Sequence, residues 1–417
     1  MPSPSTPGIQ RWLAPAVFDA LQTRRVVVLA GARQCGKTTL AKAVAAPEGV
    51  LYRPLDDPGL LAAAQADPHG FVAHGDGLMV IDEIQRAPAL LMAIKKEADE
   101  HPRPGRFLLT GSANIQSLPS VTESLAGRVS TLRLRPFSEG EMAGTAPHFI
   151  ARALRQDWDG LGPGPSKDAV LQKALRGGYL EVQALPAKSV RRWHTDYLAA
   201  LMARDLQDIA QIRRKDSMAQ LLEVLAAWSC KLMDTSAIGA QLALARPTLE
   251  SYINALESLF LVERLRPWIS TDYARVGKQD KLVMTDTGLV ASLLRWQFDS
   301  ARLDADQSGK LVEGFVYAQL AAQLDAQDEP HQLAHYRDRE QREIDFVVTT
   351  PDGSTVGIEV KAGSAVSADS FKHLRWFQDR MVPPGQVFVG LVLYTGEQVL
   401  HFGPNLWAVP MHALWSN

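Results

Sequence analysis

Residues 26–40 read VVVLAGARQCGKTTL, an apolar run that enters a loop and leaves it as a helix-forming segment. The loop, Gly31 to Thr38, has the form G-x-x-x-x-G-K-T, in which backbone N–H groups at a helix N-terminus surround phosphate oxygens. Lys37 would reach the terminal phosphates, and the hydroxyl of Thr38 would bind Mg²⁺. The stretch therefore predicts an α/β fold that binds ATP.

A second motif, GLMVIDEIQRAP at residues 77–88, supplies carboxylates for this loop. Its apolar part predicts a buried parallel strand that ends in Asp82 and Glu83, where α/β sheets place their ligands. We expect Asp82 to hold Mg²⁺ through water and Glu83 to polarise the water that attacks ATP. Carboxylates at strand ends are common, so the motif gains its weight from the preceding loop. The residues predicted to bind the nucleotide and its metal are Gly31, Ala32, Arg33, Gln34, Cys35, Gly36, Lys37, Thr38, Thr39 and Asp82.

Two further positions are candidates for sensing the γ-phosphate. The strand RFLLTGSAN, residues 106–114, ends in polar residues, of which Ser112 is the first choice and Thr110 the second. A simple polar turn is the alternative. In ESLAGRVS, Arg128 precedes a predicted strand and could be donated to the site of a neighbouring subunit, because a bidentate cation stabilises charge in phosphoryl transfer. A surface arginine is the alternative there.

The composition is that of an ordinary globular protein. Among 417 residues, 46% are hydrophobic and 22% charged, and the net charge of −2 gives no global attraction to nucleic acid. Two distant cysteines argue against a disulfide framework. No apolar run approaches the roughly 20 residues that span a bilayer, and the N-terminus lacks signal-peptide features. We expect a cytoplasmic protein without membrane contact.

Changes in composition predict three domains. Residues 1–156 alternate short apolar runs with helix-like segments, as in a P-loop ATPase domain. The segment 157–166, DWDGLGPGPS, reads as a linker. Helical periodicity dominates residues 167–299, and residues 300–417 mix one helix with several short strands. The predicted class is α/β with a helical middle.

Within the middle region, residues 217–285 resemble a winged helix-turn-helix, with three helical segments followed by a β-rich stretch. The outer face of its third helix would carry Arg246, Thr248, Ser251 and Asn254. Basic residues of the wing would be Arg264, Arg266, Arg275, Lys278 and Lys281. These residues suit phosphates of duplex DNA. Glu250 and Glu257 would repel DNA, so a protein-contact module is the alternative.

The C-terminal region contains a charged set on apolar elements. Glu313 lies on a predicted helix, Asp345 on the strand EIDFVV, and Glu359 and Lys361 on VGIEVKA. A turn at PDGS makes the strands a hairpin and places Asp345 opposite about residue 360. Converging carboxylates need a cation, so a second Mg²⁺ or Mn²⁺ is predicted at Glu313, Asp345 and Glu359, with Lys361 orienting a water. A solvated strand pair with incidental charges is the alternative.

Together these motifs resemble a bacterial and archaeal family of AAA-type ATPases that carry a C-terminal domain of unassigned function. The N-terminal matches are GARQCGKTT, VIDEIQRAP, LLTGSAN and ESLAGRV, and the C-terminal ones LRGGYLEV, TDTGLVASL, LVEGFVYAQL, REIDFVV and GIEVKAG. The resemblance implies an ATPase of the additional-strand class that forms a ring, in which Arg128 completes the neighbour's site.

The terminal part also resembles the PD-(D/E)XK nuclease superfamily, which has a restriction-endonuclease-like α/β fold. Its acidic helix residue, strand Asp and E-x-K pair match Glu313, Asp345, Glu359 and Lys361. The expected function is an ATP-hydrolysing, DNA-binding or DNA-processing homo-oligomer, with a hexameric ring as one form, acting on duplex or branched DNA. The alternative is a nucleotide-dependent switch that binds protein partners and carries a catalytically silent nuclease-like domain.

Overall fold

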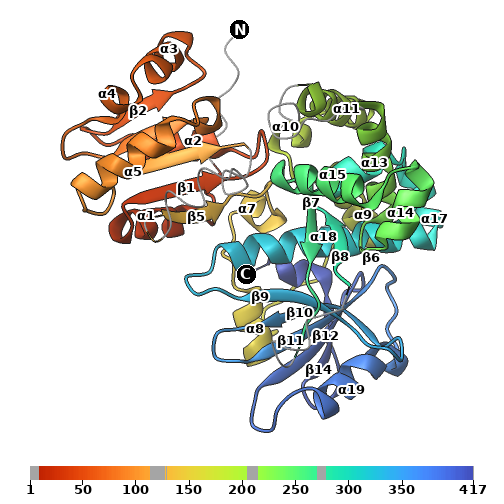
Figure 1. Ribbon diagram of the computed structural model, residues 1–417. Helices are drawn as coiled ribbons and strands as arrows, with labels where there is room; N and C mark the ends of the chain where they lie inside the picture. The colour runs from red at the N-terminus through yellow and green to blue at the C-terminus, as the bar shows by residue number, and fades with distance from the viewer. Residues whose placement is uncertain (1–8, 113–126, 128, 204–214, 270–278, 417) are drawn as a thin grey trace. The chain divides into compact units, whose positions relative to one another are not determined.

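The structure, a computed structural model, describes residues 9–112, 127, 129–203, 215–269 and 279–416 (Figure 1). It divides into two compact units, Met1–Pro136 with Ala255–Phe260, and Phe137–Asn254 with Leu261–Asn417. The three domains predicted from the sequence stay a prediction. Arg128, Arg275 and Lys278 lie outside the described residues. No described helix combines the length and apolar character needed to cross a membrane.

The first unit is built on a parallel sheet with strand order β2-β3-β4-β1-β5. Its strands are β1 (Val26–Ala30), β2 (Leu51–Pro54), β3 (Met79–Asp82), β4 (Phe107–Gly111) and β5 (Val129–Arg133). Its helices are α1 (Ala14–Thr23), α2 (Lys37–Val44), α3 (Pro58–Ala66), α4 (Pro68–Val72), η1 (Ile84–Arg86) and α5 (Leu90–Glu100). The predicted α/β class is confirmed, and β4 lies between the two motif strands as the additional strand.

Burial on both faces explains why β1 is apolar at every position. Val26 and Val28 belong to one hydrophobic cluster and Val27 and Leu29 to another. Because successive side chains of a strand point to opposite faces, a strand covered on both sides has no polar position. Helix α5 contributes to the first cluster, and α1 and α2 contribute to the second. The strand ends are left for polar side chains.

The second unit begins with helices around a small antiparallel sheet of order β6-β8-β7. The helices of this part of the chain are α7 (Glu139–Ala143), α8 (Phe149–Arg155), which packs on the larger sheet described next, α9 (Lys167–Arg176), α10 (Leu180–Gln183), α11 (Ala187–Ala203), α13 (Lys215–Trp228), α14 (Thr235–Leu242), α15 (Arg246–Ser258), whose residues from Ala255 on belong to the first unit, α16 (Thr287–Leu293) and α17 (Phe298–Leu303). The strands are β6 (Lys231–Leu232), β7 (Val262–Leu265) and β8 (Lys281–Met284). The central strand β8 pairs with both neighbours.

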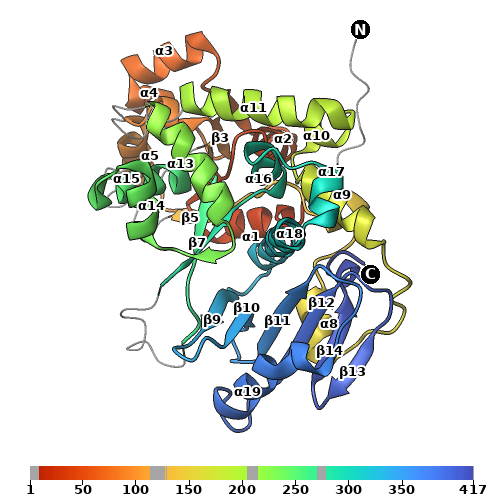
Figure 2. The same cartoon turned by 90° about the vertical axis from the view of Figure 1, so that its right-hand side faces the viewer.

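A six-stranded sheet of order β13-β14-β12-β11-β10-β9 completes the second unit (Figure 2). Its strands are β9 (Gln332–Arg337), β10 (Glu343–Thr349), β11 (Thr355–Lys361), β12 (Phe388–Tyr394), β13 (Leu400–Gly403) and β14 (Leu406–Pro410). The helices around it are α18 (Ala305–Asp325), η4 (Ala368–Phe371), α19 (Lys372–Arg380) and η5 (Met411–Leu414). Residues of α18 and of α19 pack into different hydrophobic clusters. Phe346 and Val348 of β10 belong to the α18 cluster, and Ile344 and Val347 to the α19 cluster.

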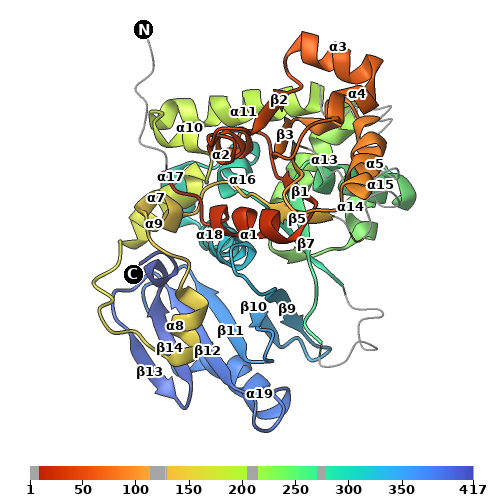
Figure 3. The same cartoon turned by 90° about the vertical axis from the view of Figure 1, so that its left-hand side faces the viewer.

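Segments far apart in the sequence meet in this unit. Helix α8 contacts β11 and β12 of the six-stranded sheet (Figure 2 and Figure 3). The side chain of Gln323, on α18, accepts a hydrogen bond from the Phe149 N–H at 3.0 Å and donates one to the Leu414 carbonyl at 2.7 Å. One buried amide thus joins the start of α8 to the C-terminal end of the chain.

The segments LRGGYLEV (residues 175–182) and TDTGLVASL (residues 285–293) also contact each other in this unit. Asp286 caps α16, and its carboxylate accepts hydrogen bonds from the N–H groups of Leu289 at 3.0 Å and Gly178 at 2.6 Å. A Cβ on Gly177, whose φ is +76°, would lie 2.3 Å from the Asp286 carboxylate. Burial raises the pKa of Asp286 to about 6, against the lowering effect of the backbone N–H groups. The buried position of Asp286 therefore favours the neutral carboxylic acid over the charged carboxylate.

We predict that Asp286 makes folding pH-dependent. Because its pKa is about 6 in the folded chain and 3.8 ordinarily, its stabilising contribution is complete below about pH 4 and is lost as the pH rises through 6. Relative to Asp286→Asn, the wild type should lose about 2 to 3 kcal/mol between pH 4 and pH 7, measured by urea unfolding. A constant difference would contradict this. Asp304→Asn, at the exposed cap of α18, is the control.

Candidate functional site

The loop Gly31–Thr38 follows the strand–loop–helix order that the sequence predicts, between β1 and α2. Lys37 begins α2 directly after Gly36, which has φ 99°. The Lys37 ammonium is buried and donates to the carbonyl oxygens of Gly31 at 2.9 Å and Ala32 at 2.8 Å. A Cβ on Gly31 would lie 2.1 Å from the carbonyl oxygen of Leu134, so only glycine fits there. The backbone carbonyls at the start of the loop thus bind the ammonium of the lysine at its end.

Arg11, a residue outside the loop, holds the loop backbone at Cys35. Cys35 is buried, and its carbonyl accepts a hydrogen bond from the Arg11 guanidinium at 2.5 Å. The same guanidinium donates to the carbonyl of Arg135 at 2.7 Å. Gln34 has the left-handed φ of 60°, which turns the chain between the two glycines. The Cys35 side chain is therefore part of the core, and Arg11 is a supporting residue that no sequence motif indicated.

Asp82 is held by two hydroxyl groups at the end of β3. Its Oδ2 accepts a hydrogen bond from the Tyr52 hydroxyl at 2.7 Å, and its Oδ1 accepts one from the hydroxyl of Thr110. Burial and this bond to Asp82 raise the pKa of Tyr52 well above its ordinary value, so Tyr52 remains a donor. Tyr52 was missed because nothing in its sequence context on β2 indicated a polar role.

Glu83 occupies a strained backbone position beside Asp82. Its φ of 60° and ψ of 48° are left-handed, which costs a residue with a side chain about 1–3 kcal/mol and is typical of functional sites. Its N–H donates to the Thr110 hydroxyl at 3.1 Å, and its Oε2 accepts from the Ser112 hydroxyl at 3.1 Å. Gln85 donates to both Glu83 and Ser112, the latter at 2.8 Å. The structure thus brings both sensor candidates to the motif carboxylates.

These residues fit a nucleotide with Mg²⁺. A buried ammonium whose partners among the described residues are the neutral carbonyls of Gly31 and Ala32, at the N-terminus of a helix, is suited to anionic oxygens. Thr38 follows Lys37 on α2, and Asp82 offers carboxylate oxygens at the end of β3. Bound ATP would supply the phosphoryl group for transfer. The chain's own part is to hold the phosphates, orient the carboxylates and position a water at Glu83.

The charged residues of the C-terminal hairpin also converge. Strands β10 and β11 pair antiparallel, as predicted, with Phe346 opposite Ile358. This register sets Asp345 opposite Glu359, one residue from the predicted position. Asp345 Oδ2 accepts the Val360 N–H at 2.8 Å, and Glu359 lies 3.5 Å from the Lys361 ammonium.

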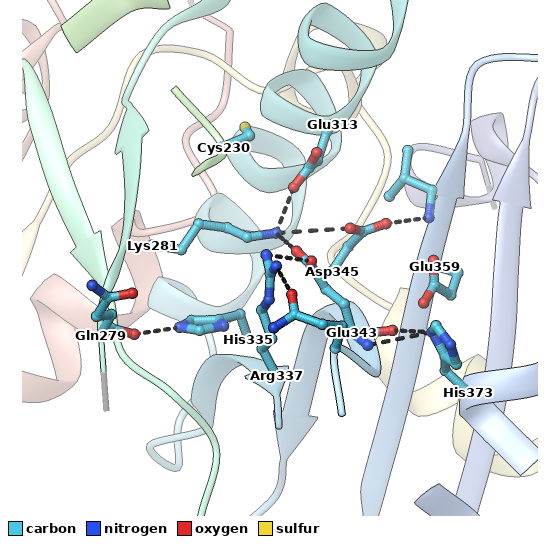
Figure 4. Close-up of polar contacts among 12 residues, drawn as sticks. Cys230, Gln279, Lys281, Glu313, His335, Arg337, Glu343, Asp345, Glu359 and His373 are labelled. Atoms are coloured by element: carbon cyan, nitrogen blue, oxygen red, sulfur yellow. Dashed lines mark hydrogen bonds and ion pairs between the residues drawn. The ribbon is translucent and has the colours of Figure 1, made fainter. Parts of the chain in front are cut away.

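A lysine lies at the centre of the acidic cluster. The Lys281 ammonium is 2.8 Å from Glu313 Oε1, 3.2 Å from Glu343 Oε1 and 3.7 Å from Asp345 Oδ1 (Figure 4). Burial alone would lower the pKa of Lys281, but these carboxylates raise it above its usual value. Burial raises the pKa of Glu313, and Lys281 opposes that rise. Lys281 is therefore held as a charged ammonium.

This geometry bears on two sequence-based predictions. Lys281 was expected to face DNA in the wing, and that prediction is wrong, because its side chain is 1% exposed. A metal ion was predicted at Glu313, Asp345 and Glu359. In the structure the Lys281 ammonium lies beside two of these carboxylates, Glu313 and Asp345. Within the described ranges, no group of three or more His, Cys, Asp or Glu side chains could hold a metal ion. That Glu343 and Lys281 belong to this cluster was not predicted, because their spacing matches no motif.

The third helix of the middle region keeps its predicted faces. Leu249, Tyr252, Ile253 and Leu256 of α15 are buried. Arg246, Ser251 and Asn254 are exposed, and Thr248 is half-buried. Arg246 lies 3.4 Å from Glu250, and Arg264 donates to the Asn254 side chain at 2.9 Å. The outer face is therefore polar, with its charge partly paired.

Three family models match successive parts of the chain. Residues 23–143 match the family described as AAA domain. Residues 167–300 and 308–414 match two domains of unknown function, DUF8612 and DUF4143 respectively. These matches assign an activity class only to the N-terminal part.

Two curated relatives span most of the chain. It is 30% identical over 396 residues to the uncharacterized proteins Mb2031c of Mycobacterium bovis and Rv2008c of Mycobacterium tuberculosis, covering 94% of this chain and 81% of each relative. Among solved structures, the Walker-type ATPase PABY2304 of Pyrococcus abyssi overlaps with a TM-score of 0.41 and 15% identity, over 68% of this chain and 94% of that one. This overlap is loose, so the fold assignment rests on the sheet order and the AAA-domain match.

We predict that Thr110 stabilises the carboxylate pair. Thr110→Val keeps the side-chain shape but leaves Asp82 Oδ1 and the Glu83 N–H without this partner. The free energy of unfolding should fall by about 1–3 kcal/mol in urea titrations. Thr23→Val removes an exposed hydroxyl bonded only within α1 and should change stability by less than about 0.5 kcal/mol. Equal effects of the two changes would contradict the prediction.

Proposed function

Because this chain belongs to a family of AAA-type ATPases with a C-terminal domain of unknown function, which includes the two mycobacterial relatives, we propose that it hydrolyses ATP to control a DNA-binding helical module. The observation that carries the proposal is the arrangement of Glu83, Ser112 and Thr110 at the ends of adjacent strands, beside the strand that leads to Lys37. Such an arrangement is suited to positioning a water for attack on a bound phosphate.

The roles follow from the contacts. Lys37 and the loop backbone bind the phosphates, and Thr38 and Asp82 hold Mg²⁺. Glu83 accepts the proton of the attacking water, and its carboxylate is oriented by Ser112 and Gln85. The strained backbone of Glu83 fixes the direction of the carboxylate before any substrate binds. Arg128 of a neighbouring subunit in a ring would complete the site.

The DNA-binding part is supported by topology and by one exposed face. Helices α13, α14 and α15 precede β7 and β8, and the sheet order β6-β8-β7 is that expected for a winged helix. Arg246, Ser251 and Asn254 are exposed on α15 and could bind phosphates of duplex or branched DNA. With ATP and DNA as its ligands, the protein would act in the cytoplasm.

A second candidate is a nucleotide-dependent switch that binds a protein partner. Glu250 lies 3.4 Å from Arg246, so part of the positive charge on α15 is already neutralised. Lys281, one of the basic residues expected in the wing, is buried. Both observations reduce the cationic surface available to DNA.

We predict that Glu83→Gln retains ATP binding and loses turnover. The amide keeps the shape but cannot accept a proton, so steady-state phosphate release with Mg²⁺ should fall about 100-fold or more. Fluorescent-nucleotide binding should be unchanged. Glu100→Gln, at the exposed end of α5, is the control and should turn over like the wild type. Unaltered turnover in Glu83→Gln would remove the proposed catalytic role.

We predict that Arg246→Glu weakens DNA binding. Replacing the cation reverses a charge on the exposed face of α15, so affinity for labelled duplex and four-way-junction DNA should fall several-fold and its salt dependence should decrease. Fluorescence anisotropy would measure both. Arg192→Glu, an equally exposed change on α11, is the control. Absence of DNA binding by the wild type, and of DNA-stimulated ATP turnover, would favour the protein-partner switch.

A further inference from the structure

We propose that Lys281 takes the place of the metal ion that the nuclease-like pattern implies, so that the C-terminal domain binds no divalent cation at this cluster and does not cut nucleic acid. In this arrangement the acidic residues hold β8 of the small sheet against α18 and β10. The inference is independent of ATP hydrolysis and of DNA binding by α15.

The positions of the charges carry the first step. The Lys281 ammonium lies within 4 Å of carboxylate oxygens from Glu313, Glu343 and Asp345, which come from two different elements (Figure 4). Glu313 is on α18, and the other two are on β10. A divalent ion bound by the same oxygens would lie against a fixed ammonium. Like charges at that distance repel strongly in a buried site.

The lysine cannot withdraw to make room. Its backbone lies in β8, the central strand of its sheet, opposite Leu232 on β6 and Leu265 on β7. Its side chain is 1% exposed, and the ammonium lies 5.9 Å from the ring centre of Phe346. Moving the ammonium to water would require the side chain to leave this buried position and its carboxylate partners.

The remaining ligands of a metal site are also engaged. Asp345 Oδ2 accepts the Val360 N–H at 2.8 Å, and Glu359 pairs with Lys361 at 3.5 Å. Glu343 also binds Arg337 at 3.1 Å. Mg²⁺ requires several free oxygen ligands in near-octahedral geometry. The chain instead supplies three cations of its own, Lys281, Arg337 and Lys361, which offset most of the charge of the four carboxylates without a metal.

A stability measurement distinguishes the two arrangements by sign. Around a lysine, Glu313→Gln or Asp345→Asn removes a partner of a buried ammonium, so the melting temperature should fall, by about 5 °C or more. At a metal site without its metal, the carboxylates repel one another, and the same substitutions should raise the melting temperature. Glu340→Gln, an exposed carboxylate near β10, is the control. A rise in either cluster variant would overturn the proposal.

A metal titration gives the second test. Without nucleotide, Mg²⁺ or Mn²⁺ should not shift the melting temperature of the wild type. In Lys281→Met, the freed carboxylates should bind Mn²⁺, which would raise the lower melting temperature of that variant. Lys310→Met removes a lysine paired with Asp306 and should gain no metal response. If Lys281→Met does not fold, the wild-type titration and the two acidic variants still decide.

Cleavage gives the last test. The wild type should leave labelled duplex, single-stranded and four-way-junction DNA intact with Mg²⁺ or Mn²⁺, with and without ATP. Metal-dependent cutting that disappears in Asp345→Asn and Lys361→Ala would overturn the proposal, as would a wild-type Mn²⁺ response that Asp345→Asn abolishes.

Discussion

The buried ammonium of Lys281 constrains much of the second unit. A lysine removed from water needs opposite charge beside it, because an unpaired buried charge is strongly destabilising. The carboxylates come from α18 and β10, so the helix, the six-stranded sheet and the small sheet are fixed relative to Lys281 by one set of contacts. The apolar residues around them, such as Phe346, stabilise the assembly but do not specify which charges meet.

In the first unit the corresponding constraint is the position of β4. Because β4 lies between β1 and β3, polar residues at its carboxyl end reach both motif carboxylates. Thr110 contacts Asp82 and the backbone of Glu83, and Ser112 contacts the Glu83 side chain. Strands β1 and β3 are completely buried and serve as a scaffold, whereas the candidate site residues lie at the strand ends. This separation lets a rigid sheet hold a strained residue such as Glu83.

Local patterns predicted much of this structure. The nucleotide loop, the strand before Asp82 and the hairpin of β10 and β11 each depend on residues close in sequence, where periodicity and turn chemistry act directly. The sequence could not place Lys281. It was expected among the basic residues of the wing, and its actual partners lie 32 to 64 residues further along the chain. Tyr52 and Arg11 were missed for the same reason, because their partners are set by sheet order and loop packing.

The hydrogen bonds of Gln323 have a consequence for synthesis. Phe149 leaves the ribosome long before Gln323 and Leu414, yet one buried amide joins all three residues. Helix α8 likewise belongs against strands that are translated some 200 residues later. The first unit has nearly all of its sheet early and can begin to order during translation. The apolar face of α8 therefore stays uncovered until β11 and β12 have been made, and a chaperone would protect it from aggregation in that period.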